Sequence, residues 1–158
     1  DAGPDIQGKG DKLTTYLRVR DPKGAWSGAL FGKGAGQEGV HFRMFGDDVD
    51  GDGAGDIGIE MAVGDGVVRA SFPVSAVDAT AWHDLVGRYD GKELALFCDG
   101  KRMAATPSSG ALTMSNAPLL IATDLEAGKP VRTFHGELED AALWARTLSD
   151  GEIERLSR

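Results

Sequence analysis

Charged side chains lie opposite the apolar residues of two expected strands. The segment GVHFRMFG, residues 39–46, alternates so that His41 and Arg43 fall on the face away from its apolar side chains. The segment DIGIEMAV, residues 56–63, places Glu60 on the corresponding face. Guanidiniums donate and carboxylates accept paired hydrogen bonds, so such residues on rigid strands are suited to binding sugar hydroxyls.

A third strand adds an acid and a base to this set. WHDLVGRY, residues 82–89, places Asp84 and Arg88 on one face. If the three strands are neighbours, all five charged side chains project from the outer face of one sheet. An aromatic ring usually completes a sugar site, and Trp26 and Trp144 are the candidates. The alternative is a solvated face with cross-strand ion pairs, each contributing about 0.2–1 kcal/mol.

An Asp/Gly-rich segment has part of a calcium-loop pattern. In DDVDGDGAGDIG, residues 47–58, Asp48, Asp50 and Asp52 match the first, third and fifth positions of an EF-hand loop, and Asp56 matches the ninth. The acid required at the end of the loop comes one residue late, and strands flank the segment rather than helices. The alternative is a hairpin loop whose carboxylates bond their own backbone.

A further acidic pair lies near the C-terminus. Glu137 and Glu139 in GELEDA, residues 136–141, point to one face of a strand. Retaining glycosidases use two carboxylates about 5–5.5 Å apart. The third acid of a glucanase-type triplet would fall on Ala142, so the catalytic pattern is incomplete, and the alternative is an exposed polar strand.

The elements that must position these residues are mostly short strands. Strand patterns bounded by turn signals recur every 8–12 residues, which is typical of a sandwich or barrel of roughly ten to twelve strands. They cover residues 13–20, 29–34, 39–46, 56–63, 67–74, 82–89, 93–104, 118–124 and 134–145. Only the C-terminal SDGEIERLSR predicts a helix, because Ser149 and Glu152 have the spacing of a capping box.

Size and charge restrict the possible functions. The 158 residues are expected to form one domain, 1–158. The net charge of −8 argues against nucleic acid and anionic membrane surfaces as partners. No apolar run approaches the roughly 18 residues of a membrane span. The single cysteine, Cys98, excludes an intrachain disulfide and is expected to be a small buried side chain.

Several motifs together resemble a known family. WHDLVGRYDGKELALFCDGKRMA followed by FHGELEDAALWARTLSDGEIERLS is similar to laminin-G-like, concanavalin A-like jelly-roll domains. The matching residues are Trp82, His83, Tyr89, Asp90, Gly91, Asp99, Gly100, Phe134, Gly136, Asp140, Arg146, Leu148, Ser149, Glu152 and Ile153. YLRVRDPKGAW, ALFGKG and WHDLVGRYDG most resemble the carbohydrate-binding modules of family 32 fructan hydrolases of the levanase type.

This resemblance implies a fold and a function. The fold would be an all-β, two-sheet antiparallel sandwich with one short C-terminal helix. The function would be a non-catalytic, monomeric module that binds fructan, such as levan or a terminal fructoside, and targets an attached glycoside hydrolase. The protein would be located outside the cell or in the periplasm. Because the chain does not begin with Met, we interpret it as an excised domain.

The resemblance also leaves other functions open. Related jelly rolls often hold a structural calcium at an acid matching Asp140. The rival functions are a glycosidase that uses Glu137 and Glu139 and a laminin-G-like protein-interaction domain. Fold alone does not decide among them.

Overall fold

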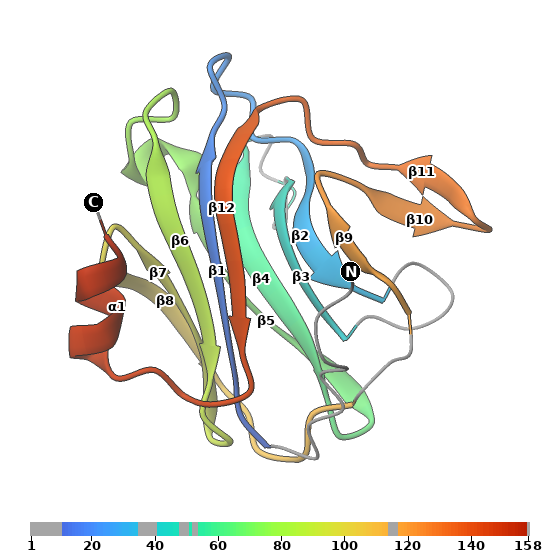
Figure 1. Cartoon of the computed structure of the whole chain (residues 1–158), viewed down its shortest axis with the longest axis vertical. Coiled ribbons are helices and arrows are strands. Elements are labelled where there is room, and N and C mark those ends of the chain that lie inside the picture. The colour runs from blue at the N-terminus through green and yellow to red at the C-terminus, as the bar shows by residue number, and fades with distance from the viewer. Residues whose placement is uncertain (1–10, 35–40, 48–50, 52–53, 114–116, 158) are drawn as a thin grey trace.

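Two antiparallel sheets stack face to face in the computed structural model, which describes residues 11–34, 41–47, 51, 54–113 and 117–157 (Figure 1). The first, here called the β1 sheet, has the order β12-β1-β6-β7-β8. Its strands are β12 (Glu137–Trp144), β1 (Leu13–Arg20), β6 (His83–Tyr89), β7 (Glu93–Cys98) and β8 (Lys101–Pro107). The expected two-sheet β-sandwich is therefore confirmed.

The second sheet, here called the β3 sheet, has the order β5-β4-β3-β2-β9. Its strands are β5 (Gly66–Pro73), β4 (Asp56–Val63), β3 (Phe42–Asp47), β2 (Gly28–Lys33) and β9 (Leu119–Ile121). A separate hairpin of β10 (Asp124–Glu126) and β11 (Lys129–Val131) projects beyond this sheet in Figure 1. A 3-10 turn, η2 (Val74–Ala76), follows β5.

The main core lies between the sheets and uses the inward residues that the alternation indicated. Phe42, Met44, Ile57 and Ile59 from the β3 sheet are fully buried against the β1 sheet. The sheets approach so closely at Gly87 that a Cβ there would lie 2.0 Å from Ile59 Cδ1. Glycine at this position therefore permits the close packing of the two layers.

Helix α1 (Asp150–Leu156) packs on the outer face of the β1 sheet (Figure 1). The predicted capping box is present, because the Ser149 hydroxyl accepts from Glu152 N and the Glu152 carboxylate accepts from Ser149 N at 2.8 Å. Ile153 joins Tyr16 and Phe97 in a second apolar cluster beneath the helix. Within the described ranges, no helix has the length and apolar character needed to cross a membrane.

Candidate functional site

The outer face of the β3 sheet carries a row of charges across three strands. Arg43 on β3 lies opposite Glu60 on β4, and Glu60 lies opposite Arg69 on β5. Arg43 Nη2 is 2.8 Å from Glu60 Oε1, and Arg69 Nη2 is 2.6 Å from Glu60 Oε2. Only 4% of the Glu60 side chain is exposed. The sequence therefore places Arg43 and Glu60 on one face correctly.

The hairpin β10–β11 supplies a second buried acid to this row. Asp124, whose side chain is 2% exposed, accepts from Arg43 Nη1 at 2.9 Å and also from Arg132 Nη2. Burial raises the pKa of the Asp124 carboxyl, but hydrogen bonds from Arg132, Leu125 N–H and Arg43 outweigh it, so the net pKa is lowered. Sequence reasoning missed Asp124 and Arg132, because it treated residues 118–124 as one strand and predicted no hairpin beyond it.

These five residues, Arg43, Glu60, Arg69, Asp124 and Arg132, form what we call the ion-pair network. Every guanidinium in it contacts a buried carboxylate, and both carboxylates contact two arginines. The Nε atom of Arg43 is buried and has no hydrogen-bond partner among the residues that the structure describes. The two buried carboxylates hold the three guanidiniums in fixed directions, and the network keeps one net positive charge.

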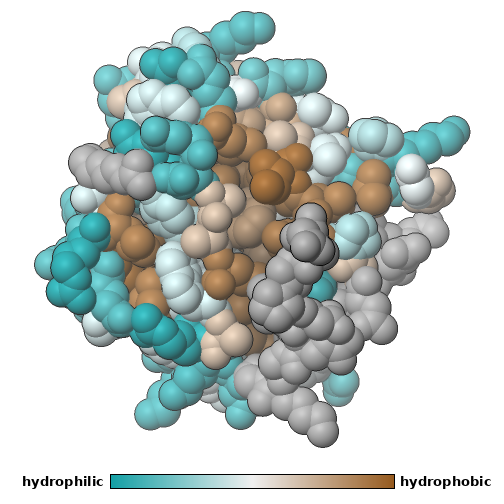
Figure 2. Space-filling view, in the orientation of Figure 1, coloured by the Kyte–Doolittle hydropathy of each residue, from teal (hydrophilic) through white to brown (hydrophobic). Residues whose placement is uncertain are grey.

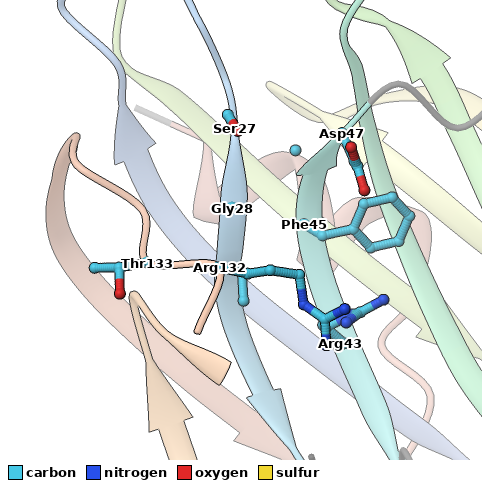
Figure 3. Close-up of a pocket in the computed structure, with 9 residues that line it drawn as sticks. Ser27, Gly28, Arg43, Phe45, Asp47, Arg132 and Thr133 are labelled. Carbon is cyan, nitrogen blue, oxygen red and sulfur yellow. The ribbon is translucent and has the colours of Figure 1, made fainter. Parts of the chain in front are cut away.

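A small pocket of about 90 Å³ opens beside the network. Figure 3 shows the side chains of Arg43 and Arg132 reaching toward the same region, with Phe45 and Asp47 beside them. The pocket is lined by Ser27, Gly28, Ala29, Arg43, Phe45, Gly46, Asp47, Arg132 and Thr133. Hydroxyl, carboxylate and guanidinium groups thus surround a space that holds only part of a ligand.

Phe45 forms a wall of this pocket rather than an open platform. Its side chain is buried, and its ring lies so close to Gly58 that a Cβ there would come within 2.5 Å of Phe45 Cζ. The guanidiniums of Arg43 and Arg69 both lie 5.4 Å from the ring centroid. Recognition at this pocket must therefore depend on hydrogen bonds more than on stacking.

Asp84 and Arg88 do not join this face, and the expectation of one five-residue surface is wrong. Both residues lie on β6, which belongs to the β1 sheet. Asp84 is buried and accepts from Tyr16 Oη at 2.7 Å and from Arg18 Nη1 at 2.9 Å. Two-residue alternation reports which side of a strand a residue occupies, but not which sheet contains the strand.

Arg88 instead ties helix α1 to the β1 sheet. It is 9% exposed, and its Nη1 donates to Leu148 O at 3.1 Å and pairs with Asp150. Its guanidinium lies 4.8 Å from the centroid of the Phe97 ring. These contacts attach the C-terminal segment to the β1 sheet.

His41 and Trp26 are core residues rather than exposed ligand contacts. The His41 Nδ1 lies against the Thr113 carbonyl, and burial lowers the pKa of His41. Trp26 is fully buried, and its Nε1 donates to Ala79 O at 2.6 Å. Neither side chain is available as the donor or the sugar platform that the sequence indicated.

Trp144 lies away from the pocket, at the end of β12 in the β1 sheet. Its side chain is half-buried and packs against the apolar cluster beneath helix α1. The structure therefore separates Trp144 from Arg43 and Glu60, with which the sequence grouped it.

The predicted calcium ligands are divided among different parts of the chain. Asp48, Asp50 and Asp52 lie outside the described residues. Asp56 is buried at the start of β4, and Asp140 is exposed on β12, opposite Arg18.

Among the described residues, one group of three side chains has metal-ligand spacing, His83, Cys98 and Asp99. It contains none of the predicted calcium ligands. Burial raises the pKa of the Cys98 thiol well above its usual range, which disfavours the thiolate that metal binding needs.

The acidic pair on β12 is engaged in surface ion pairs. Glu139 Oε2 lies 2.6 Å from Arg18 Nε, and Glu137 Oε2 lies 2.6 Å from Arg20 Nη2. The two arginines also lie over the Trp82 ring. This arrangement is the polar strand face that the sequence left open as the alternative to a catalytic pair.

Comparison with known proteins identifies the wider group to which this fold belongs. The family described as "Concanavalin A-like lectin/glucanases superfamily" matches residues 11–154. No curated protein matches the chain.

Solved structures with low sequence identity share the fold. The carbohydrate-binding module CBM40 of the Ruminococcus gnavus IT-sialidase, bound to α2,3-sialyllactose, is 19% identical with a TM-score of 0.73, over 94% of this chain and 84% of that one. The NanB sialidase of Streptococcus pneumoniae is 18% identical with a TM-score of 0.72, over 92% and 24%. Domains LG4-5 of the mouse laminin α1 chain are 18% identical with a TM-score of 0.63, over 91% and 40%.

Proposed function

The chain belongs to the concanavalin A-like lectin/glucanases superfamily, and we propose that it is a non-catalytic carbohydrate-binding module. The observation that carries this proposal is the ion-pair network beside the pocket of Arg43, Asp47 and Arg132. It combines fixed donors, acidic acceptors and a small opening on a rigid sheet, which suits the hydroxyls of a terminal sugar. The similarity in fold to a carbohydrate-binding module supports the same function.

The charges of the network and of Asp47 together sum to zero, which favours a neutral sugar. Arg43, Arg69 and Arg132 are already paired with the buried carboxylates of Glu60 and Asp124, and Asp47 adds a further negative charge at the pocket. A sugar carboxylate would therefore meet guanidiniums that are already paired with buried carboxylates. Sialyllactose, which the Ruminococcus gnavus module binds, carries such a carboxylate.

The finer part of the proposal is a fructan ligand. The resemblance of WHDLVGRYDG and ALFGKG to fructan-hydrolase modules supports levan or a terminal fructoside, and a neutral pocket is compatible with both. In this function the module acts extracellularly or in the periplasm as a monomeric domain, 1–158. It raises the local substrate concentration of an attached glycoside hydrolase.

Calorimetry against levan, inulin and fructose, with sialyllactose as the anionic control, tests the ligand class. We expect saturable heat with a fructan and none with sialyllactose at the same concentration. Binding of sialyllactose alone would contradict the neutral-sugar assignment, and heat from none of the four would contradict the fructan assignment.

Calcium at the Asp-rich segment 47–58 is a separate proposal, supported by the spacing of Asp48, Asp50, Asp52 and Asp56. A ligand that binds only the folded state raises its stability. The melting temperature should therefore be higher with millimolar calcium than with EDTA, and equal values with both would refute the site.

A further inference from the structure

A second groove lies on the opposite side of the molecule from the ion-pair network. It has a volume of about 280 Å³ and is lined by Trp144, Arg146, Leu148, Glu152, Arg155 and Leu156. These residues come from the end of β12, the following loop and helix α1. Figure 2 shows apolar side chains between α1, at the left edge of the view, and the neighbouring strands.

The groove combines an apolar interior with a charged rim. Trp144 is half-buried, Leu148 is buried, and both belong to the cluster that packs beneath the helix. The charged residues Arg146, Glu152 and Arg155 complete the lining. An indole beside paired hydrogen-bonding groups suits a sugar ring, which has apolar C–H faces and polar hydroxyl edges.

The rim is held in a fixed geometry. Arg146 binds the Glu152 carboxylate with both terminal nitrogens, Nη1 at 3.1 Å and Nη2 at 2.7 Å. The same carboxylate accepts from Ser149 N in the capping box. The hydrogen bond from Arg146, followed by that from Ser149 N–H, lowers the pKa of Glu152 to about 2, so the pair stays ionised near neutral pH.

We propose that this groove is a second carbohydrate subsite, which takes one or two rings of a neutral glycan against Trp144 and the Arg146–Glu152 pair. Its ligand class rests on the proposed function. Its volume is close to the lower limit of about 300 Å³ for small-molecule pockets. Arg155, which has no ion pair among the described residues, supplies a further donor at the rim.

The position of the groove gives the module two independent sites. The ion-pair network lies on the outer face of the β3 sheet, and the groove lies on the outer face of the β1 sheet. A short oligosaccharide cannot reach both faces, because the whole sandwich lies between them. A polymer or two separate chains can occupy both, so binding to an insoluble polysaccharide gains avidity that binding to a short oligosaccharide does not.

Indole N–H signals in a two-dimensional NMR spectrum test the subsite without requiring a destabilising change. The chain has three tryptophans, and Trp144→Phe assigns the Trp144 signal. The probes are a β-2,6-linked fructo-oligosaccharide and a cello-oligosaccharide. We expect one of them to shift the Trp144 signal saturably, and to do so equally in the Arg132→Ala variant.

The outcomes separate this inference from the proposed function. A shift of the Trp144 signal with no shift in the backbone N–H signals of residues around Arg43 would support the subsite and contradict the first site. A response around Arg43 with no Trp144 shift at saturation would overturn the subsite alone. An absent Trp144 shift with both probes likewise overturns the subsite.

A matched pair of variants provides a second test. Arg146 and Arg102 are similarly exposed, 53% and 49%, and each pairs with one glutamate, but only Arg146 lines the groove. Arg146→Ala should weaken the affinity measured at Trp144 about tenfold, the loss expected for one charge-assisted hydrogen bond. Arg102→Ala should leave that affinity unchanged, and an equal effect of both variants would contradict the subsite.

Discussion

Arg43 Nη1 lies 2.9 Å from Asp124 Oδ2 and connects strand β3 to the hairpin β10–β11 across 81 residues of sequence. The same guanidinium holds Glu60 on the neighbouring strand at 2.8 Å. A single side chain thus pairs with two buried carboxylates, and one of them, Asp124, also holds Arg132 at the pocket. The candidate site depends on this one residue for its stability as well as for its shape.

Replacing Arg43 with Met should destabilise the fold markedly. The variant leaves Asp124 and Glu60 buried with one arginine each, and loss of a partner from a buried pair typically costs about 3–5 kcal/mol. We expect a loss of about 3 kcal/mol in urea unfolding. A loss below about 1 kcal/mol, as for exposed pairs, would show that the network is not a buried one.

Asp124 should make stability depend on pH in the acid range. Its folded pKa is lowered, so its contribution is fully present above the unfolded value of about 3.8 and is lost as pH falls through the folded pKa. The stability difference between wild type and Asp124→Asn should therefore be constant near neutral pH and shrink below about pH 3.8. A difference that stayed constant from pH 6 to pH 2.5 in urea unfolding would contradict the assignment.

His41 should make stability depend on pH in a higher range than Asp124 does. Burial lowers its folded pKa below the unfolded value of 6.5, so its stabilising effect is present above pH 6.5 and declines as pH falls below it. His41→Asn keeps a donor for the Thr113 carbonyl and removes the titration. The variant should lose less stability than wild type between pH 6.5 and pH 5, and parallel curves would refute this role.

Arg88→Ala should loosen the C-terminal helix. It removes the contacts to Leu148 O and Asp150 and uncovers the Phe97 ring. We expect a loss of about 2–3 kcal/mol, compared with less than 1 kcal/mol for Arg102→Ala, whose ion pair is exposed. Hydrogen exchange should show earlier opening of residues 150–156 in Arg88→Ala, and unchanged exchange there would contradict the anchoring role.

Much of the fold could be predicted from the sequence because local rules determine it. Alternation predicted strands 13–20 and 56–63 with the bounds that β1 and β4 have. The Ser149 and Glu152 spacing predicted the cap of helix α1. Both depend on neighbours within a few residues, which a sequence displays directly.

The candidate site was only partly predictable because it depends on long-range pairing. Arg43 and Glu60 lie on adjacent strands and were grouped correctly. Asp84 has the same alternation but lies in the other sheet, and Asp124 reaches the site through a hairpin with no strong sequence signal. Trp26 adopts a φ of 42° and is buried in the core. Its position in a turn-rich segment of the sequence does not indicate this burial.

The most direct test of the central claim compares Arg132→Ala with Arg69→Ala. The two arginines are similarly exposed, 48% and 45%, and each pairs with a buried carboxylate that Arg43 also holds, but only Arg132 lines the pocket. The measurement is the affinity for levan by calorimetry, at a temperature where wild type and both variants are equally folded. We predict that Arg132→Ala weakens binding about tenfold and that Arg69→Ala does not. Equal affinities for both variants and wild type would contradict a sugar site at this pocket.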